Sequence, residues 1–205
     1  MDSSARTPPL RRLLWVGLLL SLAGVIALAV VRRLGEEGRH LPDYGTLPGF
    51  LLTNRDGREV SLGSLDGKPW LASFIFTRCP GPCPKMTAKM AKLGERLPRD
   101  FTRVSFSVDP EHDTPAVLAA YAERYQAPPS WLFLTGSREA IYELANLGFK
   151  LLAAPSEDPT SAEGPILHST RFVLVDGEGR IRGYYNAFDP AEEDRLVAEA
   201  ATLAR

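Results

Sequence analysis

The chain has 205 residues, 24 lysines and arginines, 25 aspartates and glutamates, and a formal net charge of −1. This length suits one ordinary domain with a short appendage. A net charge near zero gives no basic surface field of the kind that nucleic-acid-binding proteins use, and two cysteines are too few for a disulfide scaffold. We therefore expect neither a nucleic-acid partner nor a small disulfide-rich protein.

The N-terminal segment predicts a membrane anchor. Residues 1–12 form a short basic tail, and residues 13–31 are an uncharged run, LLWVGLLLSLAGVIALAVV. As a helix this run would span about 28 Å, close to the ~30 Å hydrocarbon core of a bilayer. A cleaved signal peptide is the alternative, because residues 27–29 are typical of a cleavage site, but the run is longer than the apolar region of such a peptide. We expect one transmembrane helix, followed by a linker over residues 32–43.

The orientation in the membrane is predicted from topology. Three arginines precede the apolar run and three follow it within residues 32–39, so the positive-inside count is a tie. A signal anchor with a short N-terminal tail normally leaves the large domain outside the cytoplasm. No long Arg- and Ser-rich transit segment precedes the run. We expect a bacterial inner-membrane protein whose C-terminal domain, residues 44–205, lies on the periplasmic side.

Both cysteines lie in one short segment, Phe74–Pro84, with the sequence FIFTRCPGPCP. Its three prolines leave the loop few conformations, and Pro84 suits the first position of a helix. Cys83 would then lie at or beside the helix N-cap, where the helix dipole favours the thiolate that binds metals and attacks disulfides. With Cys79 only four residues away, the two sulfurs could form a disulfide or bind one soft metal ion. A structural disulfide across so short a loop would stabilise little, so we favour a functional pair.

Apolar periodicity over residues 44–205 predicts an α/β domain with a mostly parallel central sheet flanked by helices. The expected strands are Phe50–Thr53, Arg58–Leu62, Leu71–Phe76, Phe101–Val108, Trp131–Leu134, Phe149–Ala153, Arg171–Val175 and Arg180–Tyr185. Helices are expected after Pro84, after Thr114, over Ser137–Leu147 and after Asp189, where Glu192 is positioned for a capping box. A cysteine pair at a strand-to-helix turn is a thioredoxin-like arrangement, here with three residues between the cysteines.

Three further side chains near the cysteines could assist a metal site. Met86 and Met90 carry soft sulfur, but they lie on the apolar face of the helix that follows the cysteines, which favours packing over copper ligation. His112 lies in a polar loop, and we expect it to be solvated rather than an auxiliary ligand. An exposed loop is expected over residues 155–165, because that stretch is polar, acidic and contains proline and glycine.

Three motifs together resemble one known family. Residues 76–84 contain C-P-x-x-C-P, residues 107–115 read SVDPEHDTP, and His168-Ser169-Thr170 precedes an expected strand. These segments are similar to motifs of the Sco/SenC family of membrane-anchored copper proteins, which assist cytochrome c oxidase assembly. Together with the apolar N-terminal run, the resemblance covers nearly the whole chain.

The resemblance implies a thioredoxin-like fold with a central mixed sheet, and one copper ion per chain held by Cys79, Cys83 and His168. Two thiolates and an imidazole form a soft set that suits Cu(I) and also accepts Cu(II), whereas a structural zinc site would need a fourth protein ligand. The implied function is a metallochaperone that delivers copper to the CuA centre of cytochrome c oxidase subunit II. It would need a copper donor and a thiol reductant, since cysteines outside the cytoplasm are not kept reduced.

A second function stays open alongside the first. A membrane-anchored thiol–disulfide oxidoreductase would use Cys79 and Cys83 to reduce cysteines of the oxidase subunit through a mixed disulfide. His168 separates the two functions, because copper binding needs the imidazole and simple dithiol exchange does not. A pure scaffold would leave the cysteine loop unexplained.

Overall fold

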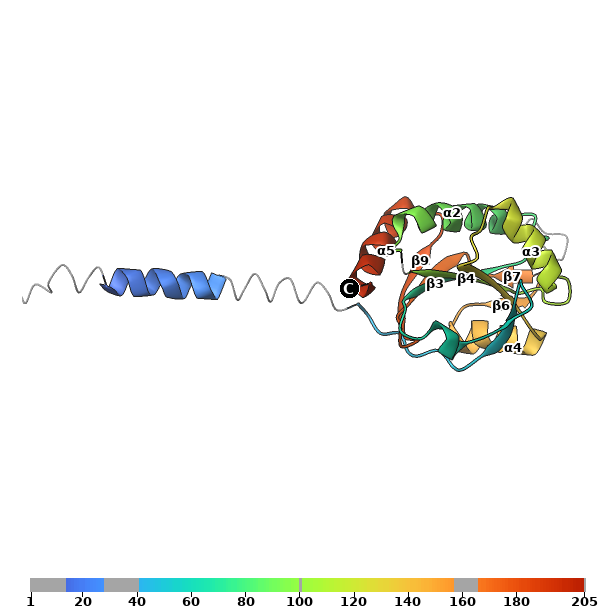
Figure 1. Ribbon diagram of the computed structural model, residues 1–205, viewed down its shortest axis with the longest axis horizontal. Coiled ribbons are helices and arrows are strands. Elements are labelled where there is room, and N and C mark those ends of the chain that lie inside the picture. The colour runs from blue at the N-terminus through green and yellow to red at the C-terminus, as the bar shows by residue number, and fades with distance from the viewer. Residues whose placement is uncertain (1–13, 28–40, 100, 157–165, 205) are drawn as a thin grey trace, which may run out of the picture. The chain divides into compact units, whose positions relative to one another are not determined.

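The computed structural model describes residues 14–27, 41–99, 101–156 and 166–204. Contacts between Cα atoms separate the chain into two compact units, residues 1–41 and 42–205 (Figure 1). The division falls within the predicted linker, residues 32–43. The predicted boundaries at residues 12 and 31 lie outside the described residues, so the division into tail, anchor and linker remains a prediction.

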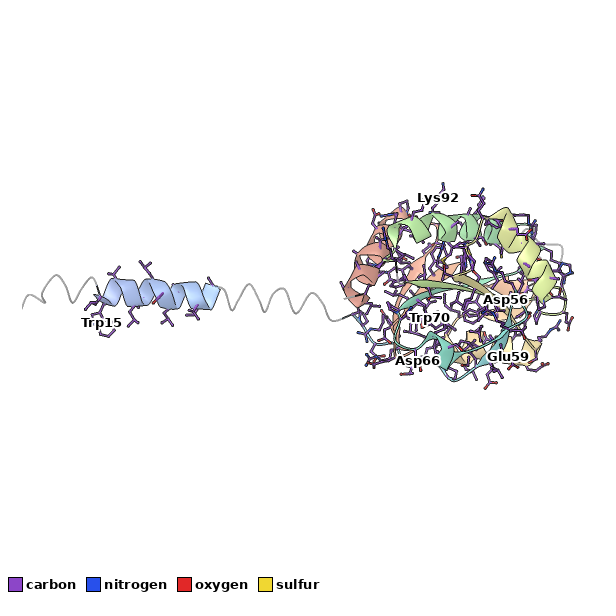
Figure 2. All side chains as sticks on the ribbon, viewed as in Figure 1. Trp15, Asp56, Glu59, Asp66, Trp70 and Lys92 are labelled. Atoms are coloured by element: carbon purple, nitrogen blue, oxygen red, sulfur yellow. The ribbon has the colours of Figure 1, made fainter. Side chains whose placement is uncertain are left out.

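The described residues of the first unit are a helix over residues 14–27 and Leu41, which lies outside it. Its apolar side chains are exposed, among them that of Trp15 (Figure 2). Within the described part of the chain, no helix is long and apolar enough to cross a membrane. The transmembrane helix predicted over residues 13–31 is therefore not confirmed; residues 13 and 28–31 of that run lie outside the described residues.

A seven-stranded mixed sheet forms the centre of the described residues of the second unit. Its strands are β1 (Leu51–Asn54), β2 (Glu59–Ser61), β3 (Trp70–Ile75), β4 (Thr102–Ser107), β5 (Trp131–Thr135), β8 (Arg171–Val175) and β9 (Ile181–Asn186), in the order β2-β1-β5-β4-β3-β8-β9. The central strands β3, β4 and β5 are parallel, while β1 and β8 join them antiparallel. The antiparallel strands on both sides of the three parallel ones make the sheet mixed, whereas the apolar periodicity predicted a mostly parallel sheet.

Helices cover both faces of this sheet (Figure 1). The helical segments are η1 (Leu62–Leu65), α2 (Pro82–Arg96), α3 (Pro115–Arg124), α4 (Arg138–Glu143), the π-helical turn η2 (Leu144–Gly148) and α5 (Pro190–Leu203). Helices α2, α3 and α5 lie on one face, and α4 lies on the other. Local sequence explains the helix starts, since Thr114, Ser137 and Asp189 each accept a main-chain N–H of the first turn.

Aromatic packing holds the α4 face of the sheet. Phe74 of β3 contacts Phe106 of β4 and Phe149, with ring centroids 5.2 and 5.1 Å apart. Trp70 is 1% exposed and packs on the same two partners, deep among the side chains of the domain (Figure 2). Burying four large rings contributes much of the core energy. The register of β3 on β4 places two of these rings side by side, because Phe74 pairs with Phe106.

Most of the predicted elements are confirmed, but one strand is wrong. The structure has no strand over residues 149–152, all of which it describes. Phe149 ends the π-helical turn, and Lys150 has φ +54°, a left-handed conformation that interrupts an extended chain. The strand begins only at Ala153: β6 (Ala153–Pro155) pairs antiparallel with β7 (Ile166–His168) in a separate two-stranded ribbon.

The capping box predicted at the last helix is also wrong. Asp189 caps α5 as expected, by accepting the Ala191 N–H. The Glu192 carboxylate instead accepts the main-chain N–H of Asn186, the last residue of β9. Glu192 therefore ties the helix to the preceding strand rather than to its own N-cap.

We expect Gly177→Ala to lower the free energy of unfolding by about 1–3 kcal/mol. A Cβ at residue 177 would lie 2.8 Å from the carbonyl carbon of Gly67 and 3.0 Å from the nitrogen of Lys68, both main-chain atoms that side-chain rotation cannot move. Urea unfolding followed by the fluorescence of buried Trp70 and Trp131 measures the effect. Gly49→Ala is the matched control, because a Cβ there meets nothing within 4 Å; equal losses in both variants would contradict the packing explanation.

Candidate metal and redox site

The cysteine loop directly follows the central strand β3 and lies at the carboxyl end of that strand. All six residues of β3 are buried, and its pairing with β4 continues one step further, because the Val108 N–H donates to the Ile75 carbonyl at 2.9 Å. The chain then turns at once: the Cys79 N–H donates to the Phe76 carbonyl at 3.3 Å. The carboxyl ends of β3 and β4 therefore meet where the cysteines lie.

Helix α2 begins earlier than the sequence predicts. Gly81 is its N-cap and Pro82 its first residue, so Cys83 lies inside the first turn rather than at the N-cap. Proline at the first helical position loses no hydrogen bond, and two prolines compete for that role in this loop. The side chain of Cys83 is fully buried, at 0% exposure, whereas Cys79 is 6% exposed. Cys79 is thus the more exposed residue of the pair.

The two thiols contact each other, and their protonation differs from the sequence-based prediction. Burial, and then the hydrogen bond with Cys79, raise the pKa of the Cys83 thiol well above its ordinary value. The predicted thiolate at Cys83 is therefore wrong for the dithiol, because loss of solvation outweighs the favourable helix terminus. A soft metal ion would displace the thiol protons and supply the positive charge that the buried thiolates lack.

Asp113 clamps the start of the cysteine loop to the neighbouring strand. Its carboxylate is fully buried and accepts three hydrogen bonds: from the Thr77 N–H at 3.0 Å, the Thr77 hydroxyl at 2.5 Å and the Ser107 hydroxyl at 2.6 Å. Thr77 lies two residues before Cys79, and Ser107 ends β4. One buried carboxylate thereby fixes the strand end from which the cysteines start.

Asp109 holds the next residue of the loop. Its carboxylate is 2% exposed and accepts a hydrogen bond from Arg78 Nε at 2.6 Å, an ion pair that raises the pKa of the Arg78 guanidinium. The Asp109 carbonyl accepts the N–H groups of His112 and Asp113, at 3.1 and 2.8 Å, which closes the turn that presents both carboxylates. Both residues immediately before Cys79 are therefore held by acids of one turn.

Both acids lie in the motif SVDPEHDTP, but no role was predicted for them from the sequence. A signal was available: both follow a strand parallel to the cysteine strand, and carboxyl ends of neighbouring parallel strands meet at one sheet edge. Two aspartates four residues apart at that edge are well placed to accept the N–H groups of the cysteine loop.

The three side chains considered as auxiliary metal ligands are those of Met86, Met90 and His112. Met86 and Met90 are both 0% exposed and pack in the core beneath α2, as predicted from their spacing. His112 is exposed in its loop. The carbonyl of Cys83 accepts the Thr87 hydroxyl at 3.0 Å, and this hydroxyl also contacts the Tyr121 hydroxyl at 2.8 Å, which ties α2 to α3.

His168 is the last residue of β7, and its backbone pairs with that of Ala153 in β6. The loop predicted over residues 155–165 lies between β6 and β7, with Pro155 as the last residue of β6. Residues 157–165 and the His168 side chain lie outside the described part of the chain. Among the described side chains, no group of three or more His, Cys, Asp and Glu residues could hold a metal ion. Cys79 and Cys83 are brought together, and the ligand role of His168 remains a prediction.

Comparison with known proteins identifies the family. Residues 41–204 match the family described as SCO1/SenC. The chain belongs to the SCO1/SenC family. The chain is 37% identical to a SCO1 protein homolog of Bacillus subtilis over 189 residues, which are 88% of this chain and 95% of that protein. It is 31% identical to a putative copper-binding protein of Stutzerimonas stutzeri over 153 residues, 72% of each chain.

Solved structures of the family share the fold. A SCO1/SenC family lipoprotein from Bacillus anthracis matches with a TM-score of 0.70 at 35% identity, over 78% of this chain and 95% of that one. BsSco is described as a Sco-family cytochrome c oxidase assembly protein with a disulfide switch. It matches with a TM-score of 0.68 at 36% identity, over 80% of this chain and 96% of that one. Arabidopsis thaliana ScoI with copper bound matches with a TM-score of 0.66 at 27% identity, over 77% of this chain and 99% of that one. The predicted thioredoxin-like fold, a mixed sheet flanked by helices, is confirmed.

We expect Asp113→Ala to lower the free energy of unfolding by about 3 kcal/mol, because it leaves the part-buried donors of Thr77 and the buried hydroxyl of Ser107 without this acceptor. The loop before Cys79 would loosen, so iodoacetamide should alkylate Cys79 of the folded, reduced protein faster. Glu111→Ala is the control: this exposed residue of the same turn pairs with Arg138 at 2.8 Å and should change stability by less than about 0.5 kcal/mol. Unchanged alkylation in Asp113→Ala would show that the clamp does not order the cysteine loop.

Proposed function

We propose that the protein is a copper metallochaperone. It binds one copper ion, as Cu(I) or Cu(II), through Cys79, Cys83 and His168, and delivers it to the CuA centre of cytochrome c oxidase subunit II. The observation that carries this proposal is the pair of contacting thiols at the carboxyl end of β3. Family membership supports the metal, since relatives are named as copper-binding or were solved with copper bound.

The donor set fits a soft ion that is held and then released. Two sulfurs and one imidazole provide low coordination, which Cu(I) accepts and which leaves room for an incoming ligand. Cys79 is the more exposed residue of the two, at 6% against 0% for Cys83, so we propose that a partner's ligand first competes for the copper ion at Cys79. The burial that disfavours bare thiolates also keeps a bound ion from water.

Loading requires partners that supply copper and electrons. A disulfide between Cys79 and Cys83 would leave no thiolate for the metal, so a thiol reductant must act before loading. A copper donor then provides the ion, and an oxidase subunit receives it; the description of BsSco as an oxidase assembly protein supports that recipient.

A thiol–disulfide oxidoreductase is the second candidate, favoured by the contact between the two thiols. In this reaction the Cys79 thiolate attacks a disulfide of the oxidase subunit and releases one of its thiols. Cys83 then attacks the mixed disulfide and releases the second thiol. The protein ends with a Cys79–Cys83 disulfide, having passed two electrons to the substrate. The disulfide switch described for BsSco is consistent with such a bond in the family.

We further propose that the apolar run over residues 13–31 anchors the protein in the bacterial inner membrane, with the C-terminal domain on the periplasmic side. The uncharged sequence of the run supports an anchor. The lipoprotein description of the Bacillus anthracis relative also supports attachment to a membrane in this family.

We expect the reduced protein to bind one Cu(I) per chain under anaerobic titration against a competing chelator. His168→Ala should weaken the affinity at least about tenfold, and Cys79→Ala or Cys83→Ala should weaken it more, because thiolates are the stronger ligands for a soft ion. His112→Ala is the matched control, since its side chain lies in an exposed loop. If His168→Ala leaves the Cu(I) affinity unchanged and the protein rapidly reduces a disulfide of the oxidase subunit, the oxidoreductase function would be favoured instead.

We expect the full chain to remain with bacterial membranes during alkaline carbonate extraction, because an apolar helix of this length is held by the hydrocarbon core. A variant lacking residues 1–40 should move to the soluble fraction. Replacing Leu19 and Leu22 of the run by aspartate should have the same effect, since charge at the bilayer centre is costly. Extraction of the unaltered chain by carbonate would contradict the anchor.

A further inference from the structure

We infer that Asn146 is a positioning residue for His168. The Asn146 amide holds strand β6, the backbone partner of His168, and so sets the place from which the third ligand reaches the proposed copper site. The inference rests on the proposed function, because it assumes that His168 binds the metal.

The ribbon that carries His168 needs support from outside itself. Strands β6 and β7 have three residues each and pair with each other in a two-stranded sheet. A two-stranded ribbon of this length is marginal in water. Three residues in or next to the ribbon pack inward, with Leu151, Ala153 and Ile166 at 8, 3 and 7% exposure. Strand β6 has only small side chains to pack at Ala153 and Ala154, so polar contacts to its main chain add to the register that packing sets.

Asn146 makes such a contact with both polar groups of one residue. Its Nδ2 donates to the Ala153 carbonyl at 3.0 Å, and its Oδ1 accepts the Ala153 N–H at 2.8 Å. The N–H and C=O of a strand residue point to the same side, so the amide occupies the edge of β6 that faces away from β7. Pro155, two residues on, has no N–H to offer at that edge.

This arrangement also defines how Ala153 faces His168. Because the polar groups of Ala153 are used by Asn146, the pair Ala153–His168 is of the kind without mutual hydrogen bonds. Such pairs bring the two Cα atoms to about 4.5 Å, closer than hydrogen-bonded pairs. A shift of β6 by one residue would place a different residue opposite His168 and would replace this pair by the other kind.

The π-helical turn brings the amide to this position. In η2 the Phe149 N–H donates to the Leu144 carbonyl at 2.8 Å, and the Leu151 N–H donates to the Ala145 carbonyl at 2.9 Å. Lys150, between them, takes the left-handed conformation with φ +54° that reverses the chain after a helix. Two neighbouring residues of the turn therefore hold the chain that leads into β6: Ala145 binds Leu151, and Asn146 binds Ala153. Single π turns inside helices are frequently found at functional sites.

The position of Asn146 makes its role testable. Its side chain is exposed, so its loss leaves the aromatic core of the sheet intact. Ser137→Ala is a matched control on the same helix: the Ser137 hydroxyl is exposed and accepts the Ala140 N–H at 3.1 Å, at the end of α4 far along the chain from β6. Asn146→Ala removes two side-chain hydrogen bonds to the main chain and Ser137→Ala removes one, but only the bonds of Asn146 reach the ribbon.

The decisive experiment is a double-mutant cycle on Cu(I) affinity in the full chain, with Asn146→Ala and His168→Ala alone and together. We expect Asn146→Ala to weaken affinity on the order of tenfold, as loss of a residue supporting a metal ligand does. In the His168→Ala background the same substitution should change affinity by less than about twofold. Ser137→Ala should leave affinity unchanged in both backgrounds.

A second readout needs no metal. Before copper is added, hydrogen exchange of peptides covering residues 151–156 and 166–170 should be on the order of tenfold faster in Asn146→Ala, with exchange in β3 and β4 unchanged. If Asn146→Ala fails to fold, Asn146→Asp serves the same cycle, because it keeps the acceptor for the Ala153 N–H and removes only the donor.

The outcomes separate the inference from the proposed function. If His168→Ala leaves Cu(I) affinity unchanged, the three-ligand site is wrong and the role of Asn146 is wrong with it. If His168→Ala weakens binding but Asn146→Ala has no effect, or the same effect in both backgrounds, only the inference about Asn146 is overturned. Unchanged hydrogen exchange in the ribbon would overturn it as well.

Discussion

The buried carboxylate of Asp113 is the interaction on which the cysteine site depends. It accepts hydrogen bonds from Thr77 and Ser107, and thus joins the loop after β3 to the end of β4. A carboxylate without such donors would be costly to bury, and the donors without it would be unsatisfied. The parallel pairing of β3 and β4 makes this exchange possible, because it brings both strand ends to one edge of the sheet.

The two halves of the proposed copper site are held in different ways. Cys79 and Cys83 follow a strand buried on both faces and enter a helix tied to α3 through Thr87 and Tyr121. His168 stands on a short ribbon outside the main sheet, attached to the π-helical turn that follows α4. This difference in support would suit the proposed metallochaperone, because one ligand could leave the metal ion while the other two remain.

Much of the fold was predictable from local pattern, and the failures have physical causes. The apolar run of β3, the alternation in β4 and the caps at Thr114 and Asp189 each act over a few residues, so the sequence reveals them. The strand predicted over Phe149–Ala153 failed because Phe149 is apolar for a different reason: it packs against Phe74 in the core. The thiolate predicted at Cys83 failed because burial, which no local pattern reports, outweighs the helix terminus.

The order of residues along the chain was enough to show that two cysteines share one proline-stiffened loop between a buried strand and a helix. It also determined which family motifs surround them, because these are properties of neighbouring residues. The hydrogen bonds by which Asp113 and Asp109 hold this loop, and by which Asn146 holds the strand partner of His168, are visible only in the folded chain. Those contacts join residues 7 to 36 positions apart, and they exist only because strand pairing and a π-helical turn bring distant backbone together.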